Sequence, residues 1–422
     1  MPARRPATPC LRAQPMLTAL MAGGLLCCSA LTHAQSSWSM TKLSAPLGAR
    51  MYDYHPSLLN DQGGVQSGWI YKARNFLAIN IYYPGPGLDY KYQTVSWSTG
   101  TGNSLSAISG VKGFYPLAIN AKGNAVGHYS TDYVKLYEYF PDWTLSYFDQ
   151  KMGDVVIRRG SSNQVAPSKT FVPRAINGKD EVAGYERQPG STDPTFVRTN
   201  AQVWRGSSIV TLPAAGFISA KAVGINDTGM VVGNVTREEP NPNPAQGGPA
   251  TYFITYPAVW QNDQLVWFGG QSGSDPSLRT AEAMAVNQSG QVLINTVAKG
   301  AGIWSNGQIT WVPKPAGDTS ELRTYAMALN DKGTVVGCMI DPWASAQRQG
   351  RSIIYKQGVT KDLTTEVTSK GVKLPAANPV LYCPQAINNA DTVVTYYGDA
   401  SGNVTSQVQL TSATWVKLTP KP

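Results

Sequence analysis

The chain has 422 residues, of which 42% are hydrophobic and only 14% are charged, with 41 glycines, 29 prolines and a formal net charge of +9. So much glycine and proline beside so little charge is typical of a turn-rich, all-β protein. The lysines and arginines are scattered, without a run of five or six, and this excludes the basic patch of a nucleic-acid-binding protein.

The first 34 residues predict a secretory signal peptide. Three arginines precede an apolar run over residues 16–31, and the segment ends in Thr32-His33-Ala34. The run is too short to cross a bilayer, which takes about 20 residues, and no later stretch of that length is free of charge, Gly and Pro. We expect residues 35–422 to form one exported domain, secreted or periplasmic, with no membrane span. Loss of the three arginines lowers the formal charge from +9 to +6.

One motif recurs through the exported part: Ala, an aliphatic residue, Asn, two variable residues, Gly, one variable residue and Val-Val-Gly. An Asn that closes an Asx-turn, followed by a Gly of positive φ, predicts a tight hairpin between two strands. Aspartate takes the place of the turn glycine in two copies, Asp180 and Asp391. Seven copies are present, centred on Asn60, Asn120, Asn177, Asn226, Asn287, Asn330 and Asn388.

A second motif lies between successive copies of the first. It consists of a small residue, a variable residue, an aliphatic residue and Trp, often followed after two further residues by Gly, and is clearest at Trp204, Trp260 and Trp304. Looser copies lie at Trp97, Ile157, Tyr355 and Trp415. Since the tryptophans recur at one structural position, we expect them to pack between neighbouring units.

Seven asparagine hairpins that alternate with seven tryptophan hairpins predict an all-β, seven-bladed β-propeller with four antiparallel strands per blade. The asparagines are about 55 residues apart on average (328/6), slightly more than the usual blade of 40 to 50 residues. The chain begins and ends within a unit. We therefore expect the C-terminal strand near Trp415 to pair with N-terminal strands. One blade would then consist of this strand and three strands from the N-terminal end.

Taken together, the asparagine-glycine and tryptophan motifs make residues 38–418 resemble the HAF-repeat family of bacterial extracellular repeat proteins. The His-Ala-Phe triplet of that family is replaced here by sequences such as Gln202-Val203-Trp204. The resemblance implies an exported repeat protein and supplies no catalytic residue.

Strand alternation places both short hairpin turns of each unit on one face of the ring. The length variation then belongs to the opposite face, where variable loops on a rigid scaffold are a usual place for binding. The long segments are Tyr129–Gly153, Tyr185–Thr199, Asn234–Tyr256, Met339–Gly350 and Thr365–Leu381.

The first long segment is the richest in aromatic residues, which are interspersed with carboxylates. Such rings suit a sugar or a peptide ligand, although they also commonly cover the small core of a loop. The candidate ligand-binding residues are Tyr129, Tyr133, Tyr137, Trp143 and Tyr147.

His128 is the candidate catalytic residue, because a histidine with tyrosine and arginine neighbours is the acid-base arrangement of a propeller-type polysaccharide lyase. The sequence fixes no such neighbours, and a surface or capping role is the alternative. No histidine pair or acidic run has the spacing of metal ligands, so we expect no metal and no cofactor.

Cys338 and Cys383 are the two cysteines of the exported part. They are candidates for one disulfide in an oxidising compartment, and the alternative is two buried thiols.

The sequence favours an exported, non-enzymatic binding or interaction protein, monomeric, that presents its variable loops to an extracellular glycan or protein partner. The alternative is a carbohydrate-active enzyme, a polysaccharide lyase or hydrolase, with its site in the central funnel.

Overall fold

The structure is a computed structural model that describes residues 37–44, 57–72, 89–97, 103–104, 113–130, 134–135, 154–160, 162–188, 198–241, 250–341, 350–399 and 414–421. The chain divides into a unit of residues 1–35 and a unit of residues 36–422. The predicted signal peptide, residues 1–34, lies outside the described residues. Among those described, no helix has the length and apolar character needed to cross a membrane.

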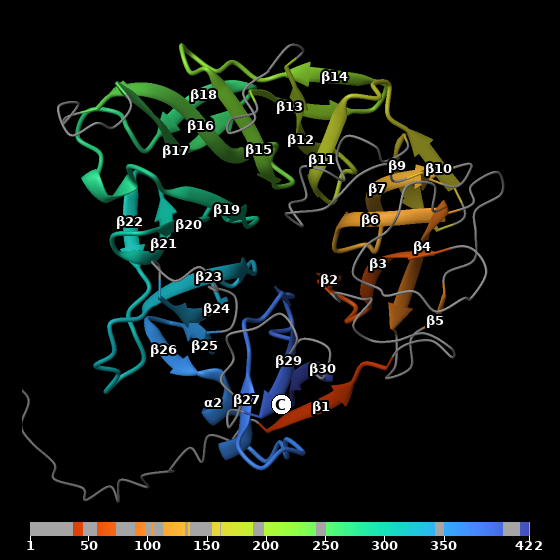
Figure 1. Cartoon of the computed structure of the whole chain (residues 1–422), viewed down its shortest axis with the longest axis vertical. Coiled ribbons are helices and arrows are strands. Elements are labelled where there is room, and N and C mark those ends of the chain that lie inside the picture. The colour runs from red at the N-terminus through yellow and green to blue at the C-terminus, as the bar shows by residue number, and fades with distance from the viewer. Residues whose placement is uncertain are drawn as a thin grey trace, which may run out of the picture. The chain divides into compact units, whose positions relative to one another are not determined.

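Residues 36–422 form seven antiparallel sheets arranged around one axis (Figure 1), which confirms the predicted seven-bladed β-propeller. Blade 1 contains β2 (Leu58–Leu59), β3 (Val65–Lys72), β4 (Asp89–Trp97) and β5 (Asn103–Ser104), with β8 (Val134–Lys135) paired to β4. Blade 2 contains β6 (Gly113–Ile119), β7 (Ala125–Ser130), β9 (Val155–Arg159) and β10 (Ser162–Val165). Blade 3 contains β11 (Phe171–Ile176), β12 (Val182–Arg187), β13 (Thr199–Arg205) and β14 (Ser208–Thr211).

The remaining blades repeat this order, with the first strand nearest the axis. Blade 4 contains β15 (Ser219–Ile225), β16 (Val231–Pro240), β17 (Thr251–Gln261) and β18 (Gln264–Phe268). Blade 5 contains β19 (Glu282–Val286), β20 (Val292–Thr296), β21 (Gly300–Ser305) and β22 (Gln308–Trp311). Blade 6 contains β23 (Arg323–Leu329), β24 (Val335–Ile340), β25 (Arg351–Lys356) and β26 (Val359–Asp362). Blade 7 contains β27 (Pro379–Leu381), β28 (Ala386–Ile387), β29 (Val393–Asp399), β30 (Thr414–Pro420) and β1 (Trp38–Lys42).

Blade 7 closes the ring by pairing strands from the two ends of residues 36–422. Strand β1 lies antiparallel to β30, with Trp38 opposite Pro420 and Lys42 opposite Val416. The predicted pairing of the C-terminal strand with the N-terminal end is thus confirmed. The expected distribution of strands was wrong, because β1 alone comes from the N-terminal end and β2 and β3 belong to blade 1. Each sheet begins at its asparagine hairpin, and the tryptophan hairpin completes the same sheet.

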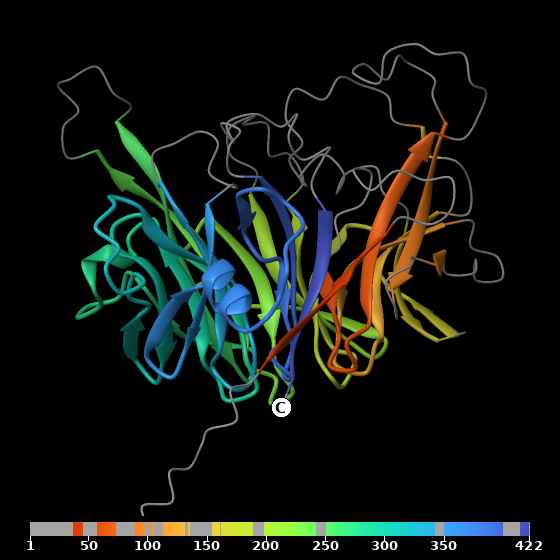
Figure 2. The ribbon, with the colours of Figure 1, turned by 90° about the horizontal axis from the view of Figure 1, so that it is seen from below.

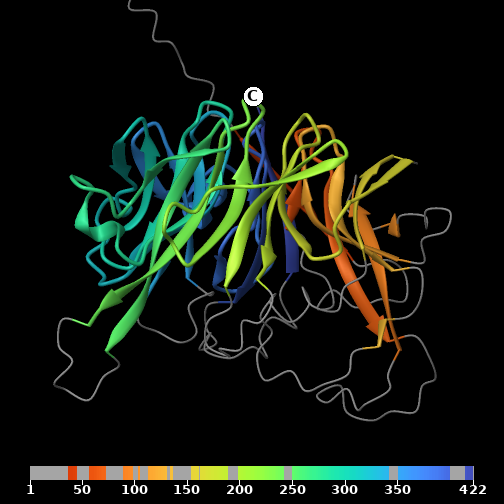
Figure 3. The same cartoon turned by 90° about the horizontal axis from the view of Figure 1, so that it is seen from above.

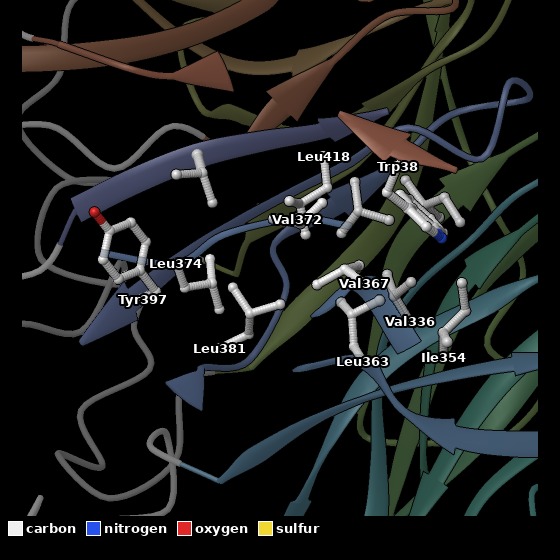
Figure 4. Packing of buried hydrophobic residues seen from close by; sticks show 13 residues of the cluster. Trp38, Val336, Ile354, Leu363, Val367, Val372, Leu374, Leu381, Tyr397 and Leu418 are labelled. Atoms are coloured by element: carbon white, nitrogen blue, oxygen red, sulfur yellow. The ribbon is translucent and has the colours of Figure 1, made fainter. Parts of the chain in front are cut away.

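The hydrophobic core lies between the blades, as the recurring tryptophans predicted. Trp204 packs with Val126 and Ile157 of blade 2, and Trp260 packs with residues of blades 3 and 4. Between blades 6 and 7, the side chains of Trp38, Val336 and Leu418 meet those of helix α2 (Leu363–Ser369), as Figure 4 shows.

Two local details follow from strand register. Arg158 lies opposite Ala125, just as Trp204 lies opposite Val182, so Arg158 and not Ile157 occupies the tryptophan position of blade 2. The first strands of blades 2 to 6 each carry a bulge, and in all of these blades but blade 5 the glycine that ends the repeat motif lies against it. A Cβ on Gly233 would approach the Lys221 carbonyl oxygen to 1.9 Å, which explains why glycine is required there.

The two ends of the blades differ (Figures 2 and 3). We call the end with the asparagine turns and the third-to-fourth-strand turns the turn face, and the opposite end the loop face. On the loop face, β16 and β17 continue as a projecting hairpin, so much of the predicted long segment Asn234–Tyr256 is a paired ladder. The predicted segment Thr365–Leu381 includes most of α2, which begins at its N-cap Asp362.

Cys338 of β24 and Cys383, which precedes β28, form a disulfide with a Cα–Cα distance of 5.0 Å. The bond joins blade 6 to blade 7, the blade that closes the ring. It therefore restrains the chain at the place where closure depends on strands from both ends.

We expect the double variant Cys338→Ser/Cys383→Ser to lower the free energy of unfolding by about 2–4 kcal/mol, because it frees a loop of intermediate length in the unfolded chain. Guanidinium denaturation followed by tryptophan fluorescence measures the change. Dithiothreitol should destabilise the parent protein to the same extent and leave the double variant unchanged. Equal stability of the two proteins under oxidising conditions would show that the bond contributes nothing.

Candidate binding site

The repeat asparagines form a ring of hydrogen bonds on the turn face. The side-chain nitrogen Nδ2 of six of them donates to the backbone carbonyl of the asparagine in the next blade, at 2.8–3.0 Å. Six junctions carry this bond, and the last of them runs from Asn388 of blade 7 to Asn60 of blade 1. The six donor asparagines are buried, so their bonds are largely shielded from water. These residues therefore connect blades, a role that their expected use as turn formers does not include.

The same side chains also close their own turns, as the Asx-turn pattern predicted. Oδ1 of Asn226 accepts from the backbone N–H groups of Thr228 and Met230 at 3.1 and 3.0 Å. The turn ends at Gly229, whose φ of 81° is in the left-handed region. One asparagine thus supplies the acceptor for its own hairpin and the donor for its neighbour.

A second set of bonds runs beside the first, formed by the residue that follows each asparagine. The side chain of Gln288 accepts from the backbone N–H of Asp227 at 2.9 Å. The backbone N–H of Gln288 in turn donates to the side chain of Asp331, also at 2.9 Å. The chain of bonds continues through Asn389 to Asp61 of blade 1. The polar groups that converge on the turn face are thus bonded to one another.

Asp180 and Asp391, which replace the turn glycine, take positive φ values of 63° and 57° and add an ion pair to the ring. The Asp391 carboxylate accepts from Asn330 of blade 6 and from the Lys356 ammonium, both at 2.7 Å. Burial alone would raise the pKa of Asp391, but the bonds from Lys356 and Asn330 outweigh burial and hold the pKa below its ordinary value of 3.8.

A third contact between blades lies eight residues after the repeat asparagine, on the second strand. Asn234 of blade 4 accepts from the backbone N–H of Ala283 in blade 5 and donates to its carbonyl, at 2.8 and 3.4 Å. Asn295 of blade 5 binds Ala326 of blade 6 in the same two ways, each at 2.9 Å. This position therefore faces the first strand of the next blade.

The candidate catalytic residue His128 occupies this same position in blade 2. Its exposed fraction is 3%, and it lies on β7 opposite Tyr115 and Val155. The residue of blade 3 that corresponds in the repeat to Ala283 and Ala326 is Pro173, which has no N–H for an asparagine to bind. This placement gives His128 a buried position between blades.

Of the candidate aromatic residues, the structure places Tyr129. Its backbone N–H donates to Asp154, and its hydroxyl lies 3.5 Å from the Asp154 carboxylate. Burial and the Asp154 charge raise the pKa of Tyr129. Tyr133, Tyr137, Trp143 and Tyr147 lie outside the described residues.

Tyr185 holds the position after Asn177 that asparagine holds in blades 4 and 5, and it gathers two cations. Arg174 of β11 donates to the Tyr185 hydroxyl at 2.7 Å, and its guanidinium carbon lies 5.2 Å from the ring centroid. The Lys221 ammonium, from β15 of the next blade, lies 5.4 Å from the same centroid. The tyrosine is 3% exposed, whereas Lys221 is exposed on a strand nearest the axis.

A contrasting cluster supports the projecting hairpin of blade 4. Arg237 lies over the Tyr256 ring at 5.1 Å, as Arg174 does over Tyr185. The Glu239 carboxylate accepts from Arg237 at 2.7 Å and from Arg279 at 3.2 Å. Hydrogen bonds from Tyr256 and both arginines outweigh burial and lower the pKa of Glu239.

The outer part of the same hairpin exposes two aromatic side chains, which the sequence reasoning had not singled out. Tyr252 is 40% exposed and Phe253 is 42% exposed. They lie opposite Glu239 and Glu238 in a ladder that continues from Val231–Trp260 to Pro240–Thr251. Among the residues that the structure describes, no group of three or more His, Cys, Asp or Glu side chains has the arrangement of a metal site.

No family model matches the sequence, and comparison with curated proteins gives no match. Solved structures give remote likenesses. The β-propeller domain of the Trilobed protease from Pyrococcus furiosus has a TM-score of 0.46 and 9% identity, over 82% of this chain and 92% of that one. An acylaminoacyl peptidase has a TM-score of 0.40 and 11% identity over 83% and 51%. The GH74 xyloglucanase from Xanthomonas campestris has a TM-score of 0.29 and 11% identity over 87% and 46%. These likenesses concern the fold.

We expect Asn226→Asp to lower the free energy of unfolding by about 1–3 kcal/mol, because it keeps the turn acceptor but removes the donor to a buried carbonyl. Urea denaturation at pH 7 measures the change. Asn163→Asp makes the same chemical substitution at an exposed residue and should be neutral. Equal effects of the two substitutions would contradict a role for the ring in stability.

The lowered pKa of Asp391 predicts a pH dependence. A carboxyl group whose pKa is lower in the folded state stabilises the fold at pH above its unfolded value, and this contribution is lost as the pH falls below 3.8 toward the folded pKa. Asp391→Asn should therefore be less stable than the parent at pH 7, and the difference should shrink in acid. Thermal unfolding at pH 7 and at steps below pH 4 measures it. If the stabilities of the two proteins differed by the same amount at every pH, the role assigned to the Asp391 carboxylate would be refuted.

Proposed function

We propose that the chain is an exported, non-catalytic binding protein of the HAF-repeat type, which holds an extracellular glycan or protein ligand on its loop face. The observation that carries the proposal is the division of chemistry between the two faces. Asparagines and carboxylates of the turn face bond to one another around the ring. Exposed aromatic side chains, by contrast, lie toward the loop face at Tyr252 and Phe253.

The projecting hairpin supports this proposal because it presents its aromatic rings on a rigid element. Ten registered residue pairs connect β16 to β17, and the Glu239 carboxylate joins Arg237 of the hairpin to Arg279 outside it. Aromatic side chains provide large contact areas and lose little conformational freedom on binding, which suits the face of a sugar ring or an apolar peptide side chain.

Two features favour binding without turnover. His128 is buried between blades, where a substrate has little access to it. Three described carboxylates of the loop face are bonded to cations: Glu239 to arginines, Asp275 to Lys299 and Asp318 to Arg351. A glycosidase needs a carboxyl pair in which one member can give up a proton, and such pairing with cations opposes protonation.

We expect the double variant Tyr252→Ala/Phe253→Ala to weaken ligand binding about 10-fold or more, since each aromatic contact contributes on the order of 1 kcal/mol. Binding is measured by calorimetry against neutral and acidic polysaccharides and denatured casein. The matched control is Val266→Ala/Val359→Ala, which removes two exposed apolar side chains on outer strands and should change nothing.

The same samples are assayed for new reducing ends and for unsaturated products. We expect neither to form. Formation of either product by the parent protein would refute a binding-only function. Unchanged affinity of the Tyr252→Ala/Phe253→Ala variant would show that the hairpin is not part of the binding site.

A further inference from the structure

Two Asn-Gly pairs occur in the chain, Asn177-Gly178 and Asn306-Gly307. In such a pair the backbone nitrogen of the glycine can attack the side-chain carbonyl carbon of the asparagine, because no Cβ hinders the approach and glycine readily reaches the backbone conformation required. Among the seven repeat asparagines, Asn177 alone is followed by glycine. One of the links between blades is therefore also a candidate for deamidation.

The reaction needs no co-reactant except water. A bond forms between the Gly178 nitrogen and Cγ of Asn177, and the bond between Cγ and Nδ2 breaks. Ammonia leaves with the proton of the Gly178 N–H, and a succinimide ring remains. Water then opens this ring at Cγ to give aspartate, or at the backbone carbonyl carbon to give isoaspartate.

The closed ring of blades holds the amide group that must move in this reaction. Oδ1 of Asn177 accepts from the backbone N–H groups of Lys179 and Glu181, at 3.0 and 2.9 Å. Nδ2 donates to the Glu181 carboxylate at 2.7 Å and to the carbonyl of Asn226 in blade 4 at 2.9 Å. The asparagine is only 3% exposed. Its amide therefore cannot turn toward Gly178 while blades 3 and 4 are joined.

The attacking nitrogen is held by blade 4 as well. The Gly178 N–H donates to the Asp227 carboxylate at 2.5 Å, and a Cβ on Gly178 would lie 2.7 Å from that carboxylate. A carboxylate is far too weak a base to remove an amide proton, so this bond restrains the nitrogen and does not activate it. Asn306 differs, because it is an exposed residue of the turn between β21 and β22.

We propose that Asn177 is a deamidation site controlled by the junction between blades 3 and 4: the closed junction prevents the reaction, and an opened junction permits it. The reaction makes the opening permanent. The aspartate product has no donor for the Asn226 carbonyl, and its charge lies beside the Glu181 carboxylate that had accepted from the amide. The isoaspartate product adds a carbon atom to the backbone of the turn. This inference does not depend on the ligand of the loop face.

The test incubates the purified protein at mildly alkaline pH and follows deamidation at both sites by mass spectrometry of its peptides. In the folded parent, Asn177 should react at least about 10-fold more slowly than Asn306, because a residue held in this way reacts only through local opening. In urea the two sites should react at similar rates. Asp227→Ala, which removes the acceptor for Gly178, should raise the rate at Asn177 at least about 3-fold and leave that at Asn306 unchanged.

The matched control is Asp331→Ala, which removes the equivalent acceptor, that of Gln288, at the junction of blades 5 and 6. It should leave the rate at Asn177 at the parent value. Equal rates at Asn177 and Asn306 in the folded parent would overturn the protection, and no reaction at Asn177 in urea would overturn the site. Equal rates at Asn177 in Asp227→Ala and Asp331→Ala would overturn control by the junction. Circular dichroism shows whether each variant is folded, and the comparison of the two sites in the parent needs no variant.

Discussion

The side-chain amide of the repeat asparagine is the interaction on which the ring depends. Its oxygen closes the turn of its own blade and its nitrogen holds the backbone of the next, so a local turn becomes a link in a circle. No other side chain of this size offers an acceptor and two donors on one planar group. The second donor is used differently around the ring, since Asn120 and Asn330 reach Asp180 and Asp391 while Asn177 and Asn287 bond within their own turns.

The sequence was sufficient to predict the number of blades, the positive-φ turns and the pairing of the two ends, because each leaves a periodic signal. It did not reveal where one sheet ends and the next begins, since a repeat can be divided at any point of its period. The bonds between asparagines were missed for a related reason. Their acceptors are backbone carbonyls about one repeat away, and a carbonyl leaves no mark on residue identity.

The candidate site shows the same limit. Residues that meet across a blade junction, such as Tyr185 and Lys221, are far apart in sequence and follow no known motif. Alignment of the repeats on their asparagines shows which residues share this position, namely Gly68, His128, Tyr185, Asn234, Asn295, Cys338 and Tyr396, so its residue type varies from blade to blade. The division between the faces explains why this variation is tolerated. The turn face holds neighbouring blades together, and this leaves loop-side positions of individual blades open to other residue types.

Pairing of β1 with β30 has a consequence for how the protein is made. Ser39 donates to Thr419 across 380 positions of sequence, so the first strand to leave the ribosome has no partner until the last one follows. Until then β1 is unpaired, and the edge of β29 that β30 covers is open to other chains. Circular permutation with new ends between β1 and β2 would place all of blade 7 in one continuous stretch, and assembly of that blade would then require only neighbouring segments.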